Sequence, residues 1–434
     1  MKLRGGVVGC GVRLALVAVA LPSAVALAAE RTPAEPALDL AALVAEAEAA
    51  NPMLRAAAER RTGAQHGPAE AGALPDPTVS FSFQNESTDW TLGESPMSNL
   101  TFAWSQEMPW GGKRRLAGDV ARGEVGLLAA EEADLRAEVR ARVKAAYVDL
   151  LRVDRTLAIL EENRRLLAAL REVAQARYEA GDALLENVLR AGAEISRLDL
   201  DIAELSGERW MVEADLGALL GRVERARFGR AVELPAVVDW DPAELEAVAA
   251  ESSTRLARAE AQIALEARRL AAARRETKAD WSWRAGYAER GGLDSIWSGG
   301  IAFRLPLYAK NKQREAIVRS EHDVEAARQE AVDVEARVLG ELRRLIVRVE
   351  VAELRRRTLE QAVMPQAQAA FDAARVAYES GQADFGTVFD AFDRTLEDAR
   401  LLERVRAEHL GGLARLEPLV GRELVLTGDG EDRE

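Results

Sequence analysis

Residues 113–177 read KRRLAGDVARGEVGLLAAEEADLRAEVRARVKAAYVDLLRVDRTLAILEENRRLLAALREVAQAR and contain no proline. A helix over this stretch would be roughly 100 Å long, because each residue adds about 1.5 Å. A globular domain cannot bury such a helix, whereas a coiled coil can, since its apolar residues recur along one seam. The apolar residues here step by three or four positions: Leu127, Ala130, Leu135, Val139, Val143, Ala146, Leu150, Val153, Leu157 and Leu160. The stretch therefore predicts one long helix that packs against other long helices.

The second half of the chain repeats the order of the first. The turn Tyr178-Glu179-Ala180-Gly181 has a counterpart 200 residues later in Tyr378-Glu379-Ser380-Gly381. Pro109, just before the long helix, has a counterpart 197 residues later in Pro306. Because the two offsets nearly agree, we expect a duplicated unit of a short helix, a strand pair and a long helical hairpin.

The expected bounds follow from the turn, proline and strand signals. The first repeat, 29–221, has a short helix near 38–66, strands at about 77–86 and 98–108, and long helices at about 113–177 and 182–220. An equatorial linker, 222–243, leads to the second repeat, 244–420, with a helix near 244–277, strands at about 278–289 and 295–305, and long helices at about 310–377 and 382–417. Residues 421–434 form a C-terminal tail.

Residues 1–28 are predicted to be a signal peptide. Basic residues precede an apolar run over 14–29, and Ala26-Leu27-Ala28 fits a small-x-small cleavage site. The single cysteine, Cys10, lies before this run, whereas a lipoprotein signal has its run before the cysteine; lipidation of Cys10 is the alternative. Without Cys10 the exported chain has no disulfide or thiol chemistry. After residue 29 no apolar stretch is long enough for a helical membrane span.

The four strand segments alternate apolar and polar residues, as in Val79, Phe81 and Phe83 against Ser80 and Ser82. Period two indicates a sheet with one apolar and one wet face. Six of the eight tryptophans lie in or beside these strands, where we expect a membrane aromatic girdle: Trp90, Trp104, Trp110, Trp281, Trp283 and Trp297. Strands of about ten residues span a bilayer, so membrane β-structure is favoured over a soluble sheet.

Four strands cannot close a barrel, since about eight are the observed minimum, and an open edge is not tolerated in lipid. Several chains must therefore contribute strands. Two chains give a narrow barrel with a packed interior; three give twelve strands with room for a lumen, and twelve long helices around a tunnel. Four chains stay open on this reasoning. The fold class expected is mainly α with membrane β.

Charge and chemistry exclude other classes of function. The net charge of −14 argues against nucleic acid as a partner. His66, His322 and His409 are far apart, and we expect surface residues rather than metal ligands. No nucleophile motif or glycine-rich phosphate loop stands out. We therefore expect no catalytic, cofactor-binding or metal residues and no enzyme.

A series of short motifs resembles the TolC family of outer-membrane efflux channels. They are Ala49 to Leu54, Leu74-Pro75-Asp76-Pro77, Pro109 to Lys113, Phe303 to Tyr308, Met364-Pro365-Gln366-Ala367 and the two Tyr-x-x-Gly turns. The resemblance implies a homotrimer in outer-membrane lipid, with a 12-stranded β-barrel continuous with a 12-helix periplasmic α-barrel. It also implies a periplasmic adaptor (a membrane fusion protein) and an inner-membrane pump of the RND type as partners.

Gln106 to Arg114 resembles the heavy-metal cation efflux (CzcC/CusC-like) subgroup, which implies heavy-metal cations as cargo. Drug efflux and type I protein secretion are the alternatives within the family. A periplasmic coiled-coil adaptor and a structural coiled coil are the alternatives of another class. An adaptor needs a lipoyl-like β-domain between its hairpin halves, and 222–243 is too short for one.

The family resemblance implies a closed periplasmic tip at the two glycine turns. Asp390 matches one of two acidic positions that narrow the pore, and Thr387 occupies the other. Tyr378 matches a tyrosine that locks the tip, with Glu186 and Asn187 as its polar partners on the neighbouring hairpin. The other residues expected there are Gly181, Asp182, Gly381 and Asp384. Plain turns and a solvated Asp390 are the alternatives.

Overall fold

The computed structural model describes residues 38–86, 88, 92–224, 227–231, 235 and 237–425. The expected signal peptide with Cys10, the tail beyond residue 425, and Trp90 lie outside these residues. The description below concerns the unit Ala37–Glu434 alone.

Three short helices open the first half: α1 (Leu40–Ala50), α2 (Pro52–Ala64) and α3 (Gly67–Gly72). Asn51 separates the first two and caps α2, since its side-chain oxygen accepts from the backbone N–H groups of Met53 at 2.9 Å and Leu54 at 3.2 Å. Pro52 fits the first helical position, where its missing N–H costs nothing. The Asn51 amide also donates to the Leu219 carbonyl at 2.7 Å, which ties this break to the end of the first hairpin.

The first long hairpin consists of α4 (Lys113–Glu179) and α5 (Leu185–Leu219). Helix α4 continues without a break over the whole proline-free stretch. The expected seam lies inward in its middle section, where Val139, Val143, Leu150 and Val153 are buried. The seam residues nearer the sheet, Leu127, Ala130 and Leu135, are half-buried.

In the second half the helices are α6 (Pro242–Ser252), α7 (Thr254–Arg275), α8 (Gln313–Thr358), the π-helical turn η1 (Leu359–Val363), α9 (Met364–Glu379) and α10 (Phe385–Val420). The single helix expected near 244–277 is broken at Ser253. Gly421, which ends α10, lies against this break: a Cβ added to it would stand 2.0 Å from the Ser252 carbonyl oxygen. The break between α6 and α7 therefore lies at a close contact with a residue distant in the sequence.

The helix expected over 310–377 also differs, because η1 interrupts it just before Pro365. Proline lacks an N–H and its ring crowds the carbonyl four residues back. A wider turn relieves this clash, and the Met364 N–H instead bonds the Leu359 carbonyl, five residues back.

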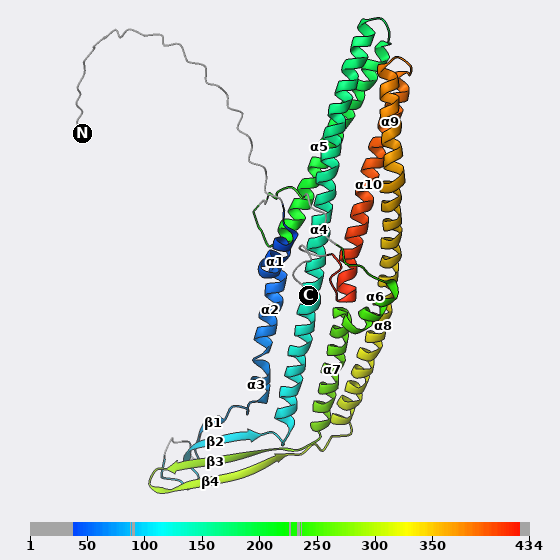
Figure 1. The fold of residues 1–434 in the computed structure, drawn as a ribbon. Coiled ribbons are helices and arrows are strands. Elements are labelled where there is room, and N and C mark those ends of the chain that lie inside the picture. The colour runs from blue at the N-terminus through cyan, green and yellow to red at the C-terminus, as the bar shows by residue number, and fades with distance from the viewer. Residues whose placement is uncertain are drawn as a thin grey trace, which may run out of the picture. The chain divides into compact units, whose positions relative to one another are not determined.

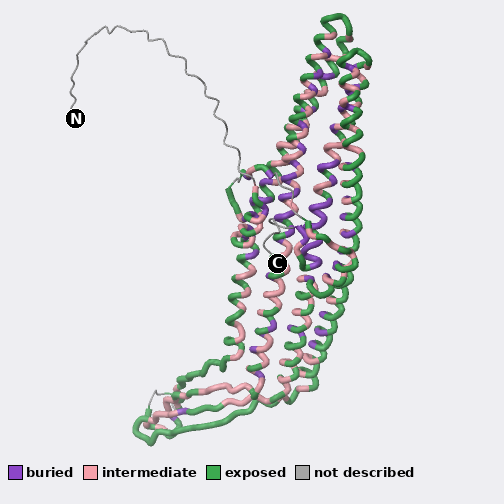
Figure 2. Tube along the Cα trace, viewed as in Figure 1, coloured by how far each residue is buried: buried purple, intermediate pink, exposed green. Residues whose placement is uncertain are grey.

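The long helices lie side by side in the order α5, α4, α10 and then α8 with α9 (Figure 1). Helix α7 packs between α4 and α8. Buried residues follow the facing sides of the helices, whereas the strands are largely half-buried or exposed (Figure 2). One core cluster fills the middle, where α1 and α6 join the bundle, and a second fills the hairpin tips.

The four strands β1 (Thr78–Gln84), β2 (Asn99–Met108), β3 (Asp280–Arg290) and β4 (Leu293–Arg304) form one antiparallel sheet in chain order. The β2–β3 pair joins the two halves of the chain. At the base of the sheet the Lys113 ammonium lies 2.9 Å from the Asp280 carboxylate, which links the start of α4 to the start of β3. None of the helices in the described ranges is both long and apolar enough to serve as a membrane span.

Candidate functional site

The register of the sheet places all four apolar strand faces on the same side. Phe81, Phe102, Tyr287 and Trp297 stand opposite one another across the four strands. The ring centroids of Phe81 and Phe102 are 4.9 Å apart, and those of Tyr287 and Trp297 are 5.0 Å apart. The expectation of one apolar and one polar face is confirmed.

This apolar face lies open in the protomer. Trp297 is 80% exposed, and Val79, Phe81, Ile301 and Phe303 are each more than half exposed. Of the expected girdle, Trp104, Trp110 and Trp283 are exposed and Trp281 is half-buried. An apolar face of this size needs cover, either from lipid or from another chain.

The two hairpin turns at the opposite end of the bundle have the same geometry. Gly181 has φ of 84° and Gly381 has φ of 77°, a region that residues with a Cβ rarely adopt. Each glycine N–H bonds the carbonyl of the tyrosine three residues earlier, Tyr178 or Tyr378, at 3.0 Å. The glycines are thus required by the turn.

Tyr378 joins the two hairpins. Its side chain is 2% exposed and lies edge-on to Phe385, with ring centroids 5.7 Å apart. Arg177 on α4 donates to the Tyr378 carbonyl at 2.6 Å, and its guanidinium lies 4.9 Å from the ring centroid. Burial raises the pKa of Tyr378. Its hydroxyl has no hydrogen-bond partner in the described part of the protomer.

Two acids that follow the second turn, Asp384 and Asp390, have a capping role or a basic partner. Asp384 caps α10, accepting from the Thr387 N–H at 2.8 Å and its hydroxyl at 2.7 Å, and these bonds lower the pKa of Asp384. Asp390 lies 3.2 Å from the guanidinium of Arg190 on α5, which also stacks over Phe389 at 4.2 Å.

Asp182 and Glu186 are exposed, and Asn187 is half-buried. The structure brings neither Glu186 nor Asn187 into a hydrogen bond with Tyr378 within the described protomer. Reasoning from the sequence missed Arg177 and Arg190. The repeat offset could have found Arg190, because it precedes Asp390 by the same 200 residues that separate the two tyrosines.

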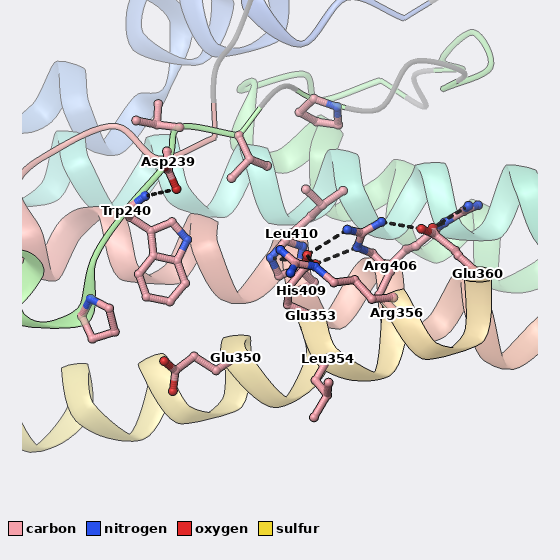
Figure 3. Close-up of a pocket in the computed structure, with 15 residues that line it drawn as sticks. Asp239, Trp240, Glu350, Glu353, Leu354, Arg356, Glu360, Arg406, His409 and Leu410 are labelled. Atoms are coloured by element: carbon pink, nitrogen blue, oxygen red, sulfur yellow. Dashed lines mark hydrogen bonds and ion pairs between the residues drawn. The ribbon is translucent and has the colours of Figure 1, made fainter. Parts of the chain in front are cut away.

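A cleft of about 610 Å³ lies between the segment 235–242 and helices α8 and α10 (Figure 3). Here the expectation that His409 is a surface residue is wrong: it is 9% exposed, because α10 packs against both α4 and α8 at this height. Burial lowers the pKa of His409. His66 and His322 are exposed as expected.

Ion pairs fill the wall of this cleft. Arg356 bonds Glu353 at 2.7 Å and Glu360 at 2.5 Å, and Arg406 bonds Glu360 at 2.8 Å. The hydrogen bonds from Arg356 lower the pKa of Glu353 to about 2. These charges are paired with one another, and the pairs connect α8 and η1 to α10. The wall of the cleft therefore has a structural role. No set of three acidic, histidine or cysteine side chains suited to a metal occurs in the described ranges.

The first half of the chain, residues 43–222, matches the sequence model of the family described as outer membrane efflux protein. The cobalt-zinc-cadmium resistance protein CzcC of Cupriavidus metallidurans is 24% identical over 382 residues, covering 84% of this chain and 85% of that protein.

Solved structures of CusC and of VceC from Vibrio cholerae have the same fold. CusC superimposes with a TM-score of 0.75 at 14% identity, covering 91% of this chain and 95% of CusC. VceC gives 0.71 at 20% identity, covering 88% of this chain and 96% of VceC.

An exposed apolar sheet face at one end and long paired hairpins at the other are features that this protomer shares with solved outer-membrane channels. The chain resembles outer membrane efflux proteins: their family model matches its first half, and its fold is that of solved outer-membrane channels. It is a channel component of the outer membrane and not an enzyme.

Proposed function

We propose that three copies of this chain form an efflux duct, with a 12-stranded barrel in the outer membrane and a 12-helix barrel in the periplasm. The observation that carries the proposal is the sheet register, which gathers every apolar strand face on one side. The outer strands of the sheet, β1 and β4, each have only one neighbouring strand in the described chain. Other copies must therefore complete the sheet before it can lie in lipid.

The edges of the helical layer support assembly in the same way. Helix α5 lies at the edge of the helical layer, packed mainly against α4, and it exposes Leu189, Leu200 and Met211, spaced by eleven residues. The opposite edge exposes Val347, Val351 and Leu354 on α8 and Val376 on α9. An eleven-residue spacing keeps a stripe on one face of a helix. Contact between α5 of one copy and α8 with α9 of the next covers both stripes.

We further propose that the hairpin tips close the periplasmic end. The Arg190–Asp390 pair and the Arg177–Tyr378 contact hold the two hairpins of one protomer together. Three copies set Asp390 and Thr387 around one axis. Opening requires the hairpins to separate, which breaks these contacts. Glu186, Asn187 and Asp182 remain available to the neighbouring copy.

The cargo we propose is heavy-metal cations, delivered by a periplasmic adaptor and an inner-membrane RND pump. The likeness to the cobalt-zinc-cadmium resistance protein over most of both chains supports this assignment. A strain lacking this chain should lose resistance to cobalt, zinc or cadmium salts and keep its resistance to hydrophobic drugs. The reverse pattern would replace metals by drugs as cargo and leave the duct itself intact.

Mass photometry of the protein extracted in detergent tests the assembly. We expect a species of three protomers. Leu200→Glu, which puts a charge into the proposed contact, should yield protomers, whereas Glu204→Gln on the same helix should not. A single-protomer mass for the unaltered chain in mild detergent would contradict the duct.

A further inference from the structure

The polar face of the sheet carries few charges. Three successive rungs across the four strands have small or apolar side chains at eleven of their twelve positions. The rungs are Thr78, Ser105, Arg284 and Gly300; Ser80, Ala103, Gly286 and Ser298; and Ser82, Thr101, Ala288 and Ile296. The one charged residue among them is Arg284.

Arg284 is surrounded by small residues on the polar face of the sheet. Its neighbours across the strands are Ser105 and Gly300, and its neighbours on the same face of β3 are Ser282 and Gly286. The residue is exposed and lines a hollow of about 690 Å³ on this face. Within the described residues it takes part in no ion pair, so its charge is directed at whatever fills the hollow.

Two basic groups near the helical end of this face are neutralised. Arg304 lies 2.6 Å from Glu107, and Lys113 lies 2.9 Å from Asp280. Both pairs lie nearer the helical end of the strands than Arg284. Asp76, ahead of β1, lines the same hollow, also at the helical end.

We propose that Arg284 selects for charge in the strand section of the duct, favouring anions over free cations. The inference rests on the proposed trimer, since only a closed barrel turns the polar face into a lumen. Threefold symmetry sets the three copies of Arg284 at one height, whatever the tilt of the strands. A guanidinium keeps its charge at any physiological pH. Metal cargo therefore passes this level more readily with an anionic partner than as a bare divalent cation.

The local potential at this rung is measurable without recording current through the tip. Ser105→Cys places a thiol beside Arg284. The probes are two methanethiosulfonates of similar size, one bearing a sulfonate and one a trimethylammonium group, added to the trimer in lipid vesicles. The single native cysteine is Cys10, so the unaltered chain provides the background rate.

The ratio of the two rates reports the charge at the rung. Adding Arg284→Ser to Ser105→Cys should lower the anionic-to-cationic ratio about five- to tenfold at about 0.01 M salt, where screening is weak. The difference should nearly vanish at about 1 M salt, where the Debye length is about 3 Å. Arg284→Lys should retain the ratio and Arg284→Glu should invert it.

A thiol at Trp104, next to Ser105 but on the apolar face, separates the two ways of failing. Should Ser105→Cys react while Trp104→Cys stays inert, the polar face lines water. An unchanged ratio in Arg284→Ser then overturns the role of Arg284 alone. Should Trp104→Cys react as fast as Ser105→Cys, the barrel orientation is wrong, and the proposed duct and the role of Arg284 both fall.

Discussion

Arg190 and Asp390 lie 3.2 Å apart and occupy equivalent positions in the two hairpins, 200 residues apart in sequence. The duplication therefore does more than repeat a fold: it sets equivalent residues of the two hairpins at the same height. Arg400 and Asp201, 199 residues apart in sequence and 2.7 Å apart in space, join the hairpins at nearly equivalent positions further along. Opposite charges at equivalent positions thus fasten one hairpin to the other.

Breaking the Arg190–Asp390 pair should loosen the tip. Both side chains are largely exposed, so the pair stabilises the closed tip by only about 0–1 kcal/mol per protomer. Three copies of the pair act together in the proposed trimer, so Arg190→Ala or Asp390→Ala should raise single-channel conductance in planar bilayers. Arg197→Ala, which removes an exposed charge paired within α5, is the control. Equal conductance in all variants would show that the Arg190–Asp390 pair does not hold the tip closed.

Tyr378 and its repeat counterpart form a matched pair. Tyr378→Ala removes a ring that is 2% exposed and should cost about 3–5 kcal/mol locally. Tyr178 is 40% exposed, so Tyr178→Ala should cost little. Limited proteolysis at the tip measures both. Tyr378→Phe should resist cleavage like the parent, because the hydroxyl has no partner in the described protomer. A Tyr378→Phe protein as labile as Tyr378→Ala would show that a neighbouring copy bonds the hydroxyl.

Lys144 holds the C-terminal segment against the bundle. Its ammonium, almost fully buried, lies 3.0 Å from Glu417, 2.7 Å from Glu423 and 2.6 Å from the Val425 carbonyl. Lys144→Ala leaves Glu417 buried without its cation and should cost about 3–5 kcal/mol. The control is Arg142→Ala, because Arg142 lies on the same helix but has an exposed side chain. Thermal unfolding followed by circular dichroism compares the two variants. Equal midpoints would show that Lys144 does not hold the C-terminal segment in place.

His409 should make stability depend on pH. Burial lowers its pKa below the ordinary 6.5, so the unfolded chain takes up this proton at a higher pH than the folded chain. Stability is therefore full above pH 6.5 and falls as the pH drops below it, by at most about 1.4 kcal/mol per pH unit. His409→Gln should flatten this window, while His322→Gln, at an exposed position, should not. Denaturant midpoints at several pH values decide it.

Local sequence chemistry predicted the parts of the fold that depend on neighbouring residues along the chain. The proline-free stretch gave α4, and period-two alternation gave the apolar face that Phe81 and Phe102 share. The Gly181 and Gly381 turns followed from the need for positive φ.

What escaped prediction depends on residues distant in the chain. The break at Ser253 lies in close contact with Gly421, and the burial of His409 depends on which helices flank α10. Pro365 could be accommodated by a kink or by a wider turn, and the sequence does not choose between them. Arg190 was overlooked because the offset had been applied to the turns alone.

The central β2–β3 pair has a consequence for how the protein is made. Leu100 of the first half lies opposite Glu289 of the second, so the four-stranded sheet cannot form until the whole first long hairpin, which lies between β2 and β3 in the chain, has been made. Contacts this distant in sequence form slowly. Until then the strands of the first half, with Phe81 and Phe102 exposed, present an unprotected edge in the periplasm. The strands of the first half therefore stay without their β3 partner while the first hairpin is being made, and the sheet can be completed before the second hairpin follows.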